Sequence, residues 1–527
     1  EHDRQAGARV PVVADRELLL DEVADEHDAP AAQDVGDRKR GERGHEHHRD
    51  AAHDARDALG DDDARQRLPV VGPQVMGGVD EAAMDAARDS GLAIISVSNT
   101  YKAIEDLAAY WRGKLNGRVI GLSGSTGKTT TKNLVRDVLS AHGSVVATQG
   151  NQNNEIGVPK TLLSAEPDTT SVVVEMGMRG LHQLDALCSF VKPSWGLLTN
   201  VGESHIELLG SRENIARAKS ELFASLPDNT GVAFLNIADD FARFVCDCAH
   251  LSDRNVGLVC YDGSLQASER VESFSYDDRI LPMVWASDIK LDPQGCASFN
   301  LCARGFGQLG LAGEPGLEIV PCTLALRGAH NVSNACAAAA VGYASGMSLA
   351  DCALALGQAK PEPGRQDILS SSKHVLEVPS DYGKEKVAEL RLTVPAGITV
   401  VDDSYNANPD SMRASLSTFS AMDVSGKRIA VLGDMGELGS FAPECHARVG
   451  SYAAHCSLDL LVCVGDLSVD IAAGAKAAGM SADKIVHVDD IEAALAYVAL
   501  RANPGDAVLV KASNFMEFSR IVKGLVG

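Results

Sequence analysis

The stretch Gly121-Leu-Ser-Gly-Ser-Thr-Gly-Lys-Thr-Thr130 decides the fold, because it joins the apolar residues 118–122 to residues 132–139, which repeat apolar side chains at helical spacing. Glycines let the backbone curl so that successive N–H groups point at phosphate oxygens, and the helix N-terminus adds partial positive charge. The lysine of such a loop reaches the outer phosphates, and the next hydroxyl can ligate magnesium. The stretch therefore predicts a nucleotide-binding loop made of Gly124, Ser125, Thr126, Gly127, Lys128, Thr129 and Thr130.

This loop departs from the usual pattern at one position. A glycine normally lies five residues before the Gly-Lys pair, and Leu122 occupies that position here. The alternative interpretation is a glycine-rich turn with a surface lysine. We favour the phosphate loop, because residues 127–131 read Gly-Lys-Thr-Thr-Thr at a junction between strand and helix.

Composition restricts the partners. The chain has 527 residues and a formal net charge of −24, which disfavours nucleic acid and anionic membranes as partners. No apolar run is long enough to cross a membrane, so we expect a soluble, cytoplasmic protein without membrane insertion. The twelve cysteines show no paired framework, which suits a reducing compartment and predicts no metal–thiolate site.

The first hundred residues differ from the rest, because no Phe, Tyr or Trp precedes Tyr101. Such a composition buries little core. We interpret residues 1–100 as a degenerate, partly disordered or mistranslated counterpart of a substrate-binding domain, with about the first 70 residues a wrong-frame or wrongly assembled translation. A histidine tract at residues 45–48 is interpreted as solvated rather than as a metal site. Residues 81–88 and 92–97 read as a helix and a strand.

After Tyr101, helical segments alternate with short β-branched strands, which predicts an α/β fold with parallel sheets. We expect a central ATP-binding domain over residues 101–360, with a β-rich interlude at 273–326, and a C-terminal Rossmann-like domain over 361–527. The second domain lacks a lysine-bearing phosphate loop, so we expect it to close over the first site. The polar stretch between Arg365 and Asp403 is interpreted as a surface insertion.

Three polar residues follow strands or lie on a helix beyond the phosphate loop. Glu175 ends a valine-rich strand, where a carboxylate can hold magnesium, His205 follows the next strand, and Lys219 lies in a helical segment. Spacing alone leaves ordinary alternatives open: a strand-end carboxylate, a loop histidine and a solvated lysine. For His205 and Lys219, spacing alone favours the ordinary alternative.

A set of short motifs carries a family resemblance that covers about residue 80 to the C-terminus. In these motifs and their order the chain resembles the Mur ligases, and among them those that add D-alanyl-D-alanine to UDP-N-acetylmuramoyl-tripeptide. The specific motifs are Asp403-Ser-Tyr-Asn-Ala-Asn-Pro409 and Gly433-Asp-Met-Gly-Glu-Leu438. The complete set comprises residues 151–159, 175–177, 199–205, 218–221, 328–331, 364–365, 402–411 and 431–438.

The resemblance implies ATP and Mg²⁺ as cofactors and gives the candidate residues their roles. Lys128 would hold the ATP phosphates, with Thr129 and Glu175 on one magnesium ion and His205 on a second. Lys219 matches the lysine that is carbamylated in this family, which turns an ammonium into a carboxylate-like metal ligand. Together with Arg365, the residues expected to be catalytic are Lys128, His205 and Lys219.

The same resemblance implies the remaining contacts. Nucleotide would be contacted by Asn331 and Arg365, the ribose region by Asp403, and the substrates by Asn154, Asn406 and Asn408. The expected partners are UDP-N-acetylmuramoyl-tripeptide and D-alanyl-D-alanine, joined by a monomer through an acyl phosphate. Two alternatives stay open: another amide ligase of the superfamily, such as a folylpolyglutamate synthase, or a noncatalytic protein with the same fold.

Overall fold

The computed structural model describes residues 10–12 and 95–527, apart from residues 278–280, 310–315 and 381–386. Most of the region interpreted as degenerate or mistranslated therefore lies outside the described residues, as do the predicted helix at 81–88 and the histidine tract. The end of the predicted strand at 92–97 is described. It forms β2 (Ile95–Val97), which pairs antiparallel with β1 (Val10–Val12).

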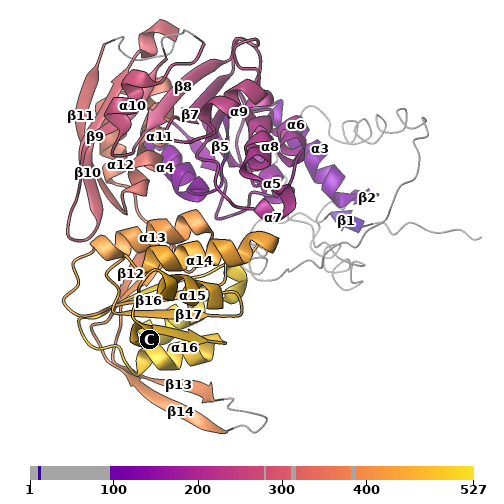
Figure 1. Cartoon of the computed structure of the whole chain (residues 1–527). Coiled ribbons are helices and arrows are strands. Elements are labelled where there is room, and N and C mark those ends of the chain that lie inside the picture. Colours follow the sequence, from indigo (N-terminus) through magenta and orange to yellow (C-terminus); the bar gives the residue numbers. More distant parts are fainter. Residues whose placement is uncertain (1–9, 13–94, 278–280, 310–315, 381–386) are drawn as a thin grey trace, which may run out of the picture.

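A nine-stranded sheet forms the central part of the chain, in the order β11-β10-β9-β8-β7-β6-β3-β5-β4 (Figure 1). The strands from β4 to β9 run parallel, whereas β10 and β11 add an antiparallel edge within the predicted β-rich interlude. The strands are β3 (Arg118–Ser123), β4 (Val145–Ala147), β5 (Ser171–Glu175), β6 (Trp195–Leu198), β7 (Val232–Asn236), β8 (Gly257–Asp262), β9 (Met283–Leu291), β10 (Cys296–Arg304) and β11 (Glu318–Arg327).

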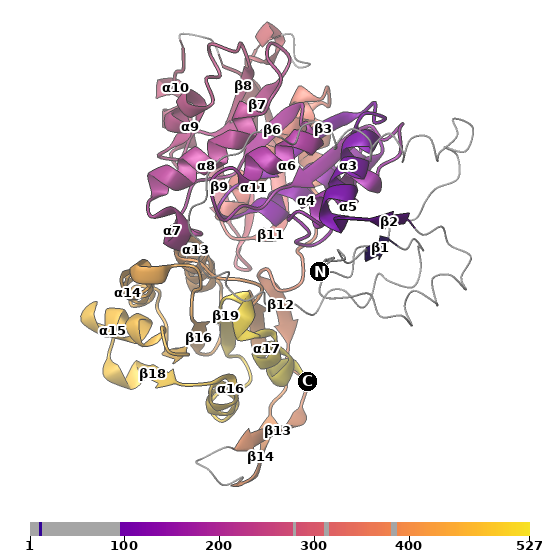
Figure 2. The same cartoon turned by 90° about the vertical axis from the view of Figure 1, so that its right-hand side faces the viewer.

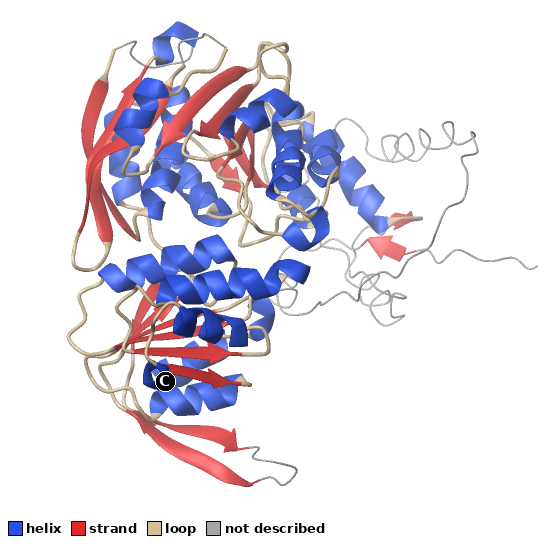
Figure 3. Cartoon of the chain, viewed as in Figure 1, coloured by secondary structure: helices blue, strands red, loops and turns tan. Residues whose placement is uncertain are grey.

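Helices cover both faces of this sheet, as Figure 3 shows. Successive β5 valines point to opposite faces, since Val172 and Val174 belong to one apolar core and Val173 to the other. Burial on both faces explains the near-continuous apolar strands. One face packs on α4 (Lys128–Ser140), α11 (His330–Ala344) and α12 (Leu349–Gly357). The other packs on α3 (Thr100–Arg112), α5 (Gly157–Leu163), α6 (Gln183–Val191), α7 (Ile206–Leu209), α8 (Arg212–Ala224), α9 (Ala242–Cys248) and α10 (Ala267–Ser273).

A second sheet follows in the order β12-β15-β19-β16-β17-β18, with only β12 antiparallel (Figure 2). Its strands are β12 (Asp367–Ser370), β15 (Thr399–Asp402), β16 (Arg428–Gly433), β17 (Leu460–Val464), β18 (Ile485–Val488) and β19 (Ala507–Lys511). Helices α13 (Pro409–Ala421), α14 (Ala442–Ala453) and α15 (Val469–Ala477) cover one face, and α16 (Ile491–Ala499) and α17 (Ser519–Val526) the other. Short 3₁₀ turns complete the elements: η1 (Phe306–Leu309), η2 (Gly439–Phe441), η3 (Ala482–Lys484) and η4 (Asn514–Met516).

The stretch between Arg365 and Asp403 is more than the expected surface insertion. Its first strand, β12, is the edge of the second sheet, and β13 (His374–Ser380) with β14 (Val387–Val394) forms an antiparallel hairpin. Figures 1 and 2 show this hairpin projecting away from the central sheet. The side chains of Leu392 and Val394 at its base are buried in the core, because they pack on the α16 side of the sheet.

The α/β fold class with parallel sheets is confirmed, whereas the domain boundaries at residues 100 and 360 stay predictions. Within the described residues, no helix is both long and apolar enough to cross a membrane. All twelve cysteines are free.

Candidate active site

The phosphate loop lies where β3 ends and α4 begins, at the carboxyl end of a parallel strand, where ligand sites of such sheets collect. Gly124 has a φ of +152° and Gly127 a φ of +75°. A Cβ atom on Gly124 would lie 1.8 Å from Oγ1 of Thr199. Asn200 holds the loop shape, since its Oδ1 accepts a hydrogen bond from the Thr126 N–H at 2.9 Å. The loop is therefore built by its backbone and by the two residues that follow strand β6.

Replacing Gly124 with alanine is expected to weaken binding of a nonhydrolysable ATP analogue by about 10²-fold, because the displaced loop can no longer point its N–H groups at phosphate. Isothermal titration would measure the affinity. Gly180→Ala is the matched control, since the added Cβ would lie 3.7 Å from Gln183, an ordinary contact. Equal affinities of both variants for the analogue would contradict the role of this loop.

Lys128 begins α4 and folds back over the loop. Its Nζ donates to the carbonyl oxygens of Gly124 at 2.8 Å and Ser125 at 3.4 Å. Desolvation lowers the pKa of this ammonium, and the nearby Glu175 carboxylate acts in the opposite direction. The amine is thus held by backbone carbonyls at the place where a phosphate would provide a stronger anionic partner.

Glu175 and Thr129 form the centre of the site. Oγ1 of Thr129 lies 3.4 Å from Oε1 of Glu175, and the Asn153 amide donates to the same oxygen at 2.9 Å. The other carboxylate oxygen, Oε2, is buried without a hydrogen bond among the described residues, and Nζ of the buried Lys132 lies 3.8 Å from it. A buried carboxylate oxygen beside a hydroxyl is a ligand set that fits Mg²⁺.

Arg365 brings the C-terminal part of the chain to this centre. Its Nη2 donates to Oγ1 of Thr129 at 3.0 Å, across 236 sequence positions, and its guanidinium stacks 4.1 Å from the Tyr405 ring centroid. Asp403 precedes Tyr405 by two residues. Its Oδ2 accepts a hydrogen bond from Nζ of the buried Lys511 at 2.8 Å. Arg365 therefore touches the phosphate loop directly, whereas Asp403 pairs with Lys511 within the C-terminal part of the chain.

His205 is placed apart from that centre, at the start of α7. Its Nδ1 lies 2.6 Å from Oε2 of Glu437, which comes from the loop after β16. Nε of Arg179 lies 3.2 Å from the other oxygen of the same carboxylate. The close approach of His205 is the largest cause that lowers the pKa of Glu437, although Nδ1 of His205 makes no hydrogen bond among the described residues. No role was predicted for Glu437, although the motif at residues 433–438 contains it.

Lys219 is buried within α8 at 1% relative exposure, and no hydrogen bond or ion pair holds its amine among the described residues. Desolvation places its pKa well below the ordinary value of 10.5, and the positive charge of Lys128 lowers the pKa further. A neutral amine is the nucleophilic form of lysine. Burial of Lys219 therefore favours the neutral amine over the ammonium.

This burial predicts a pH-dependent stability. Below pH 10.5 the unfolded chain protonates Lys219 while the folded chain resists protonation, so this residue costs more stability as the pH falls. Lys219→Met is expected to raise the thermal unfolding midpoint at neutral pH, and the gain should shrink towards pH 10.5. Scanning calorimetry without added bicarbonate would measure it, with the exposed Lys114→Met as control. A Met variant less stable than the parent at neutral pH would contradict the prediction.

The predicted substrate-binding asparagines have local structural partners. Oδ1 of Asn154 accepts from the Gly157 N–H at 2.9 Å, and that of Asn406 accepts from the Ala407 N–H. Asn408 caps α13 through Oδ1, and its amide donates to Oγ of Ser204 at 3.0 Å across the two parts of the chain. Only Asn408 therefore bridges toward the loop that contains His205.

Asn331 and Thr130 line a small cavity with Asn133, Glu362 and Arg365.

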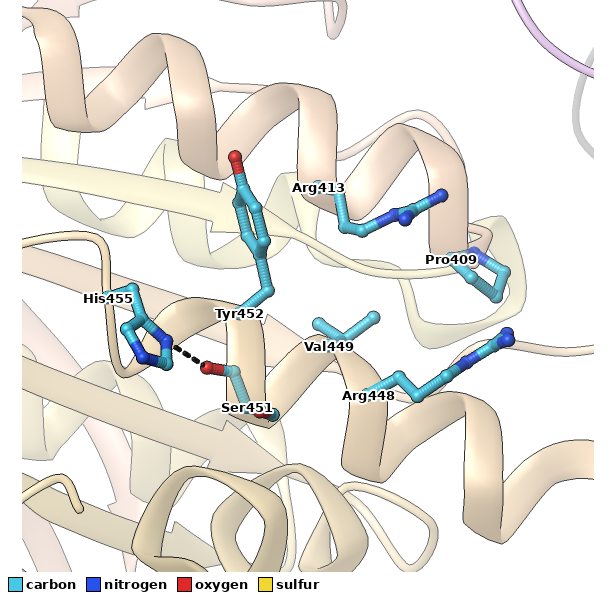
Figure 4. Close-up of a pocket in the computed structure, with 7 residues that line it drawn as sticks. All are labelled: Pro409, Arg413, Arg448, Val449, Ser451, Tyr452 and His455. Atoms are coloured by element: carbon cyan, nitrogen blue, oxygen red, sulfur yellow. Dashed lines mark hydrogen bonds between the residues drawn. The ribbon is translucent and has the colours of Figure 1, made fainter. Parts of the chain in front are cut away.

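A second cavity of about 250 Å³ lies between α13 and α14 (Figure 4). Figure 4 shows Arg413 and Arg448 on facing helices, with Tyr452 farther along α14 and His455 just beyond its C-terminal end. Both arginines already have carboxylate partners: Arg413 pairs with Asp410, and Arg448 pairs with Glu203, next to the His205 loop. The cavity thus lies beside the Arg448–Glu203 ion pair, which joins the two parts of the chain, and beside the Arg413–Asp410 pair within α13.

A phosphate loop on a parallel sheet, completed by an arginine from a second α/β unit, defines a nucleotide-dependent enzyme whose site lies between two domains. The sequence also matches two known domain families, and both belong to enzymes of this class. Residues 122–342 match the Mur ligase middle domain, and residues 389–514 match the Mur ligase, glutamate ligase domain.

Individual relatives extend the match over most of the chain. The UDP-N-acetylmuramoyl-tripeptide–D-alanyl-D-alanine ligase of Mycobacterium tuberculosis is 34% identical, covering 87% of this chain and 81% of the relative. The ligase of the same name from Bacillus subtilis is 30% identical, with 82% and 81% covered. A crystal structure of MurF from Acinetobacter baumannii has a TM-score of 0.64 at 28% identity and covers 82% of each chain. The chain belongs to the Mur ligase family.

Proposed function

We propose that this chain is an ATP-dependent ligase that joins UDP-N-acetylmuramoyl-tripeptide to D-alanyl-D-alanine. The observation that carries the proposal is the contact of Thr129, Glu175 and Arg365, in which a phosphate-loop hydroxyl, a metal-binding carboxylate and an arginine from the second domain meet. The relatives that bear this activity in their names match over more than four fifths of the chain, which supports the choice of substrates.

The chemistry needs each of these groups. A carboxylate and an amine do not condense in water, so the tripeptide carboxylate first attacks the γ-phosphorus of ATP, and ADP leaves. The dipeptide amine then attacks the resulting acyl phosphate, the C–N bond forms, and inorganic phosphate and a proton leave. The first step brings two anions together. Lys128 and Arg365 stabilise the charge on the transferred phosphoryl group by placing cations at its oxygens.

The residues proposed to bind the metal fit Mg²⁺, because Oε2 of Glu175 is buried and accepts no hydrogen bond among the described residues. Thr129 and Glu175 would hold one ion, and His205 with a carbamylated Lys219 a second. When bound, Mg²⁺ would supply further positive charge to the phosphates. Carbamylation would form a bond between Nζ of Lys219 and the carbon of CO₂ with release of a proton, which requires the neutral amine described above.

The remaining assignments are part of the same proposal. Asn331 lies at the small cavity beside α4, as expected for nucleotide binding, and Asp403 would act near the ribose. Asn154, Asn406 and Asn408 would face the substrates, with Asn408 the best placed because it already reaches Ser204. We further infer a monomer that works in the cytoplasm, where ATP and nucleotide-linked precursors are available.

The deciding experiment measures phosphate release from ATP with both substrates and with each omitted in turn, and detects the product by mass. Release that requires both substrates and yields UDP-N-acetylmuramoyl-pentapeptide is expected. Binding of an ATP analogue without any product would contradict the proposed reaction. Turnover with a folate and glutamate in place of the two substrates would favour the folylpolyglutamate synthase alternative.

A further inference from the structure

The guanidinium of Arg365 lies on an aromatic ring, and both side chains belong to the C-terminal part of the chain. Cζ of Arg365 lies 4.1 Å from the centroid of the Tyr405 ring, while Nη2 donates to Oγ1 of Thr129 at 3.0 Å. A cation over the face of an aromatic ring is attracted by the ring quadrupole. The ring therefore holds the guanidinium from one side, while Nη2 reaches the phosphate loop.

The backbone places these two side chains together. Arg365 lies two positions before β12, and Tyr405 lies three positions after β15. These strands pair antiparallel, with Asp367 opposite Asp402, so the start of one strand lies beside the end of the other. The Tyr405 N–H donates to the Gly364 carbonyl at 3.2 Å, and the φ of +72° at Gly364 favours glycine. The second sheet thus sets the arginine beside the tyrosine.

We propose that Tyr405 is a positioning residue for Arg365: its ring orients the guanidinium toward the phosphate loop before the nucleotide binds. A free arginine side chain has many rotamers, and ordering them costs free energy each time the cation is used. A cation that is oriented beforehand avoids this cost during phosphoryl transfer. This inference rests on the proposed function, because the role of Arg365 at the transferred phosphoryl group is part of it.

The contact with the ring does not depend on the central sheet. Arg365 and Tyr405 flank neighbouring strands of the second sheet, whereas Thr129 belongs to α4. The stacking therefore persists when the two parts of the chain separate, and the arginine keeps its direction. The C-terminal part thus supplies a cation that is already aimed at the phosphates when the two parts meet.

An ordinary packing role for the half-buried Tyr405 ring is the alternative. Tyr405→Leu and Tyr405→Phe separate the two roles, because both variants lose the hydroxyl and only the Phe variant keeps an aromatic face. Tyr497→Leu is the matched control. The Tyr497 ring centroid lies 3.6 Å from Cζ of Arg501, and this pair belongs to α16 and the turn after it, on the face of the second sheet opposite α13.

The experiment uses the full chain and measures two quantities. Isothermal titration gives the affinity for a nonhydrolysable ATP analogue with Mg²⁺, and phosphate release with both substrates gives kcat and KM. We expect Tyr405→Leu to lower kcat about 10-fold and the analogue affinity about 3-fold. The KM for D-alanyl-D-alanine and the thermal unfolding midpoint should stay close to those of the parent. Tyr405→Phe and Tyr497→Leu should both keep the kcat of the parent.

A double-mutant cycle tests whether Tyr405 acts through Arg365. Arg365→Met removes the cation, so adding Tyr405→Leu to it should lower neither kcat nor the analogue affinity further. Full additivity of the two substitutions would overturn the inference, as would equal losses of kcat in Tyr405→Phe and Tyr405→Leu. A parent that forms no pentapeptide, yet shows the non-additive loss of analogue affinity, would overturn the proposed reaction while supporting the role of Tyr405.

Discussion

Lys128→Ala is expected to lower kcat for pentapeptide formation by about 10³-fold, because the variant loses the cation that faces the transferred phosphoryl group. The position of the amine supports this size of effect. Lys128 lies within hydrogen-bonding distance of two loop carbonyls, so its charge is already placed over the region that phosphates would occupy. A positioned charge of this kind needs no reorganisation during the reaction.

Two controls separate this effect from a loss of folding. Lys114→Ala removes an exposed lysine whose Nζ lies 5.1 Å from the Tyr110 ring centroid, and should keep the activity of the parent. The thermal unfolding midpoint of Lys128→Ala should stay close to that of the parent, since alanine suits the first turn of α4. Phosphate release at the parent rate from a folded Lys128→Ala protein would refute the assignment of the phosphate loop.

The sheets and the phosphate loop were predictable because their signals are local. Strand β17 (Leu460–Val464) is an example, since five consecutive apolar residues between polar segments indicate a strand buried on both faces. The loop was predictable for a similar reason, because glycine spacing and the following lysine are adjacent in the sequence. Local patterns also placed Glu175 at the end of β5, where it meets Thr129.

The partners of the site residues were not predictable, because they depend on contacts between distant segments. Nothing in the sequence around Glu437 indicates that its carboxylate meets His205, which lies 232 positions earlier by numbering. Neighbouring identical residues pose the same problem: Asn153 donates to Glu175, a contact that the sequence did not indicate, whereas the role of Asn154 at the substrate stays a prediction. Only the turn geometry decides which of two adjacent asparagines points to the site.

Asp403→Ala is expected to destabilise the second sheet by about 3–5 kcal/mol, since it leaves a buried ammonium without its carboxylate. Nζ of Lys511 lies 2.8 Å from Oδ2 of Asp403, and the two side chains are only 3% and 10% exposed. Oγ of Ser415 donates to the same carboxylate, so its loss removes a second partner. Amide hydrogen exchange of β15 and β19, which flank this pair, would report the local free energy of opening.

The double variant Asp403→Ala/Lys511→Met tests the mechanism of this loss. Replacing a buried ion pair with apolar side chains is often close to neutral, so the double variant should recover most of the lost stability. Glu377→Ala is the control, because it breaks an exposed pair with Arg391 and should cost at most about 1 kcal/mol. A double variant as unstable as Asp403→Ala would show that Asp403 stabilises this sheet without Lys511. Full recovery of stability without recovery of activity would instead assign Asp403 a separate role in nucleotide binding.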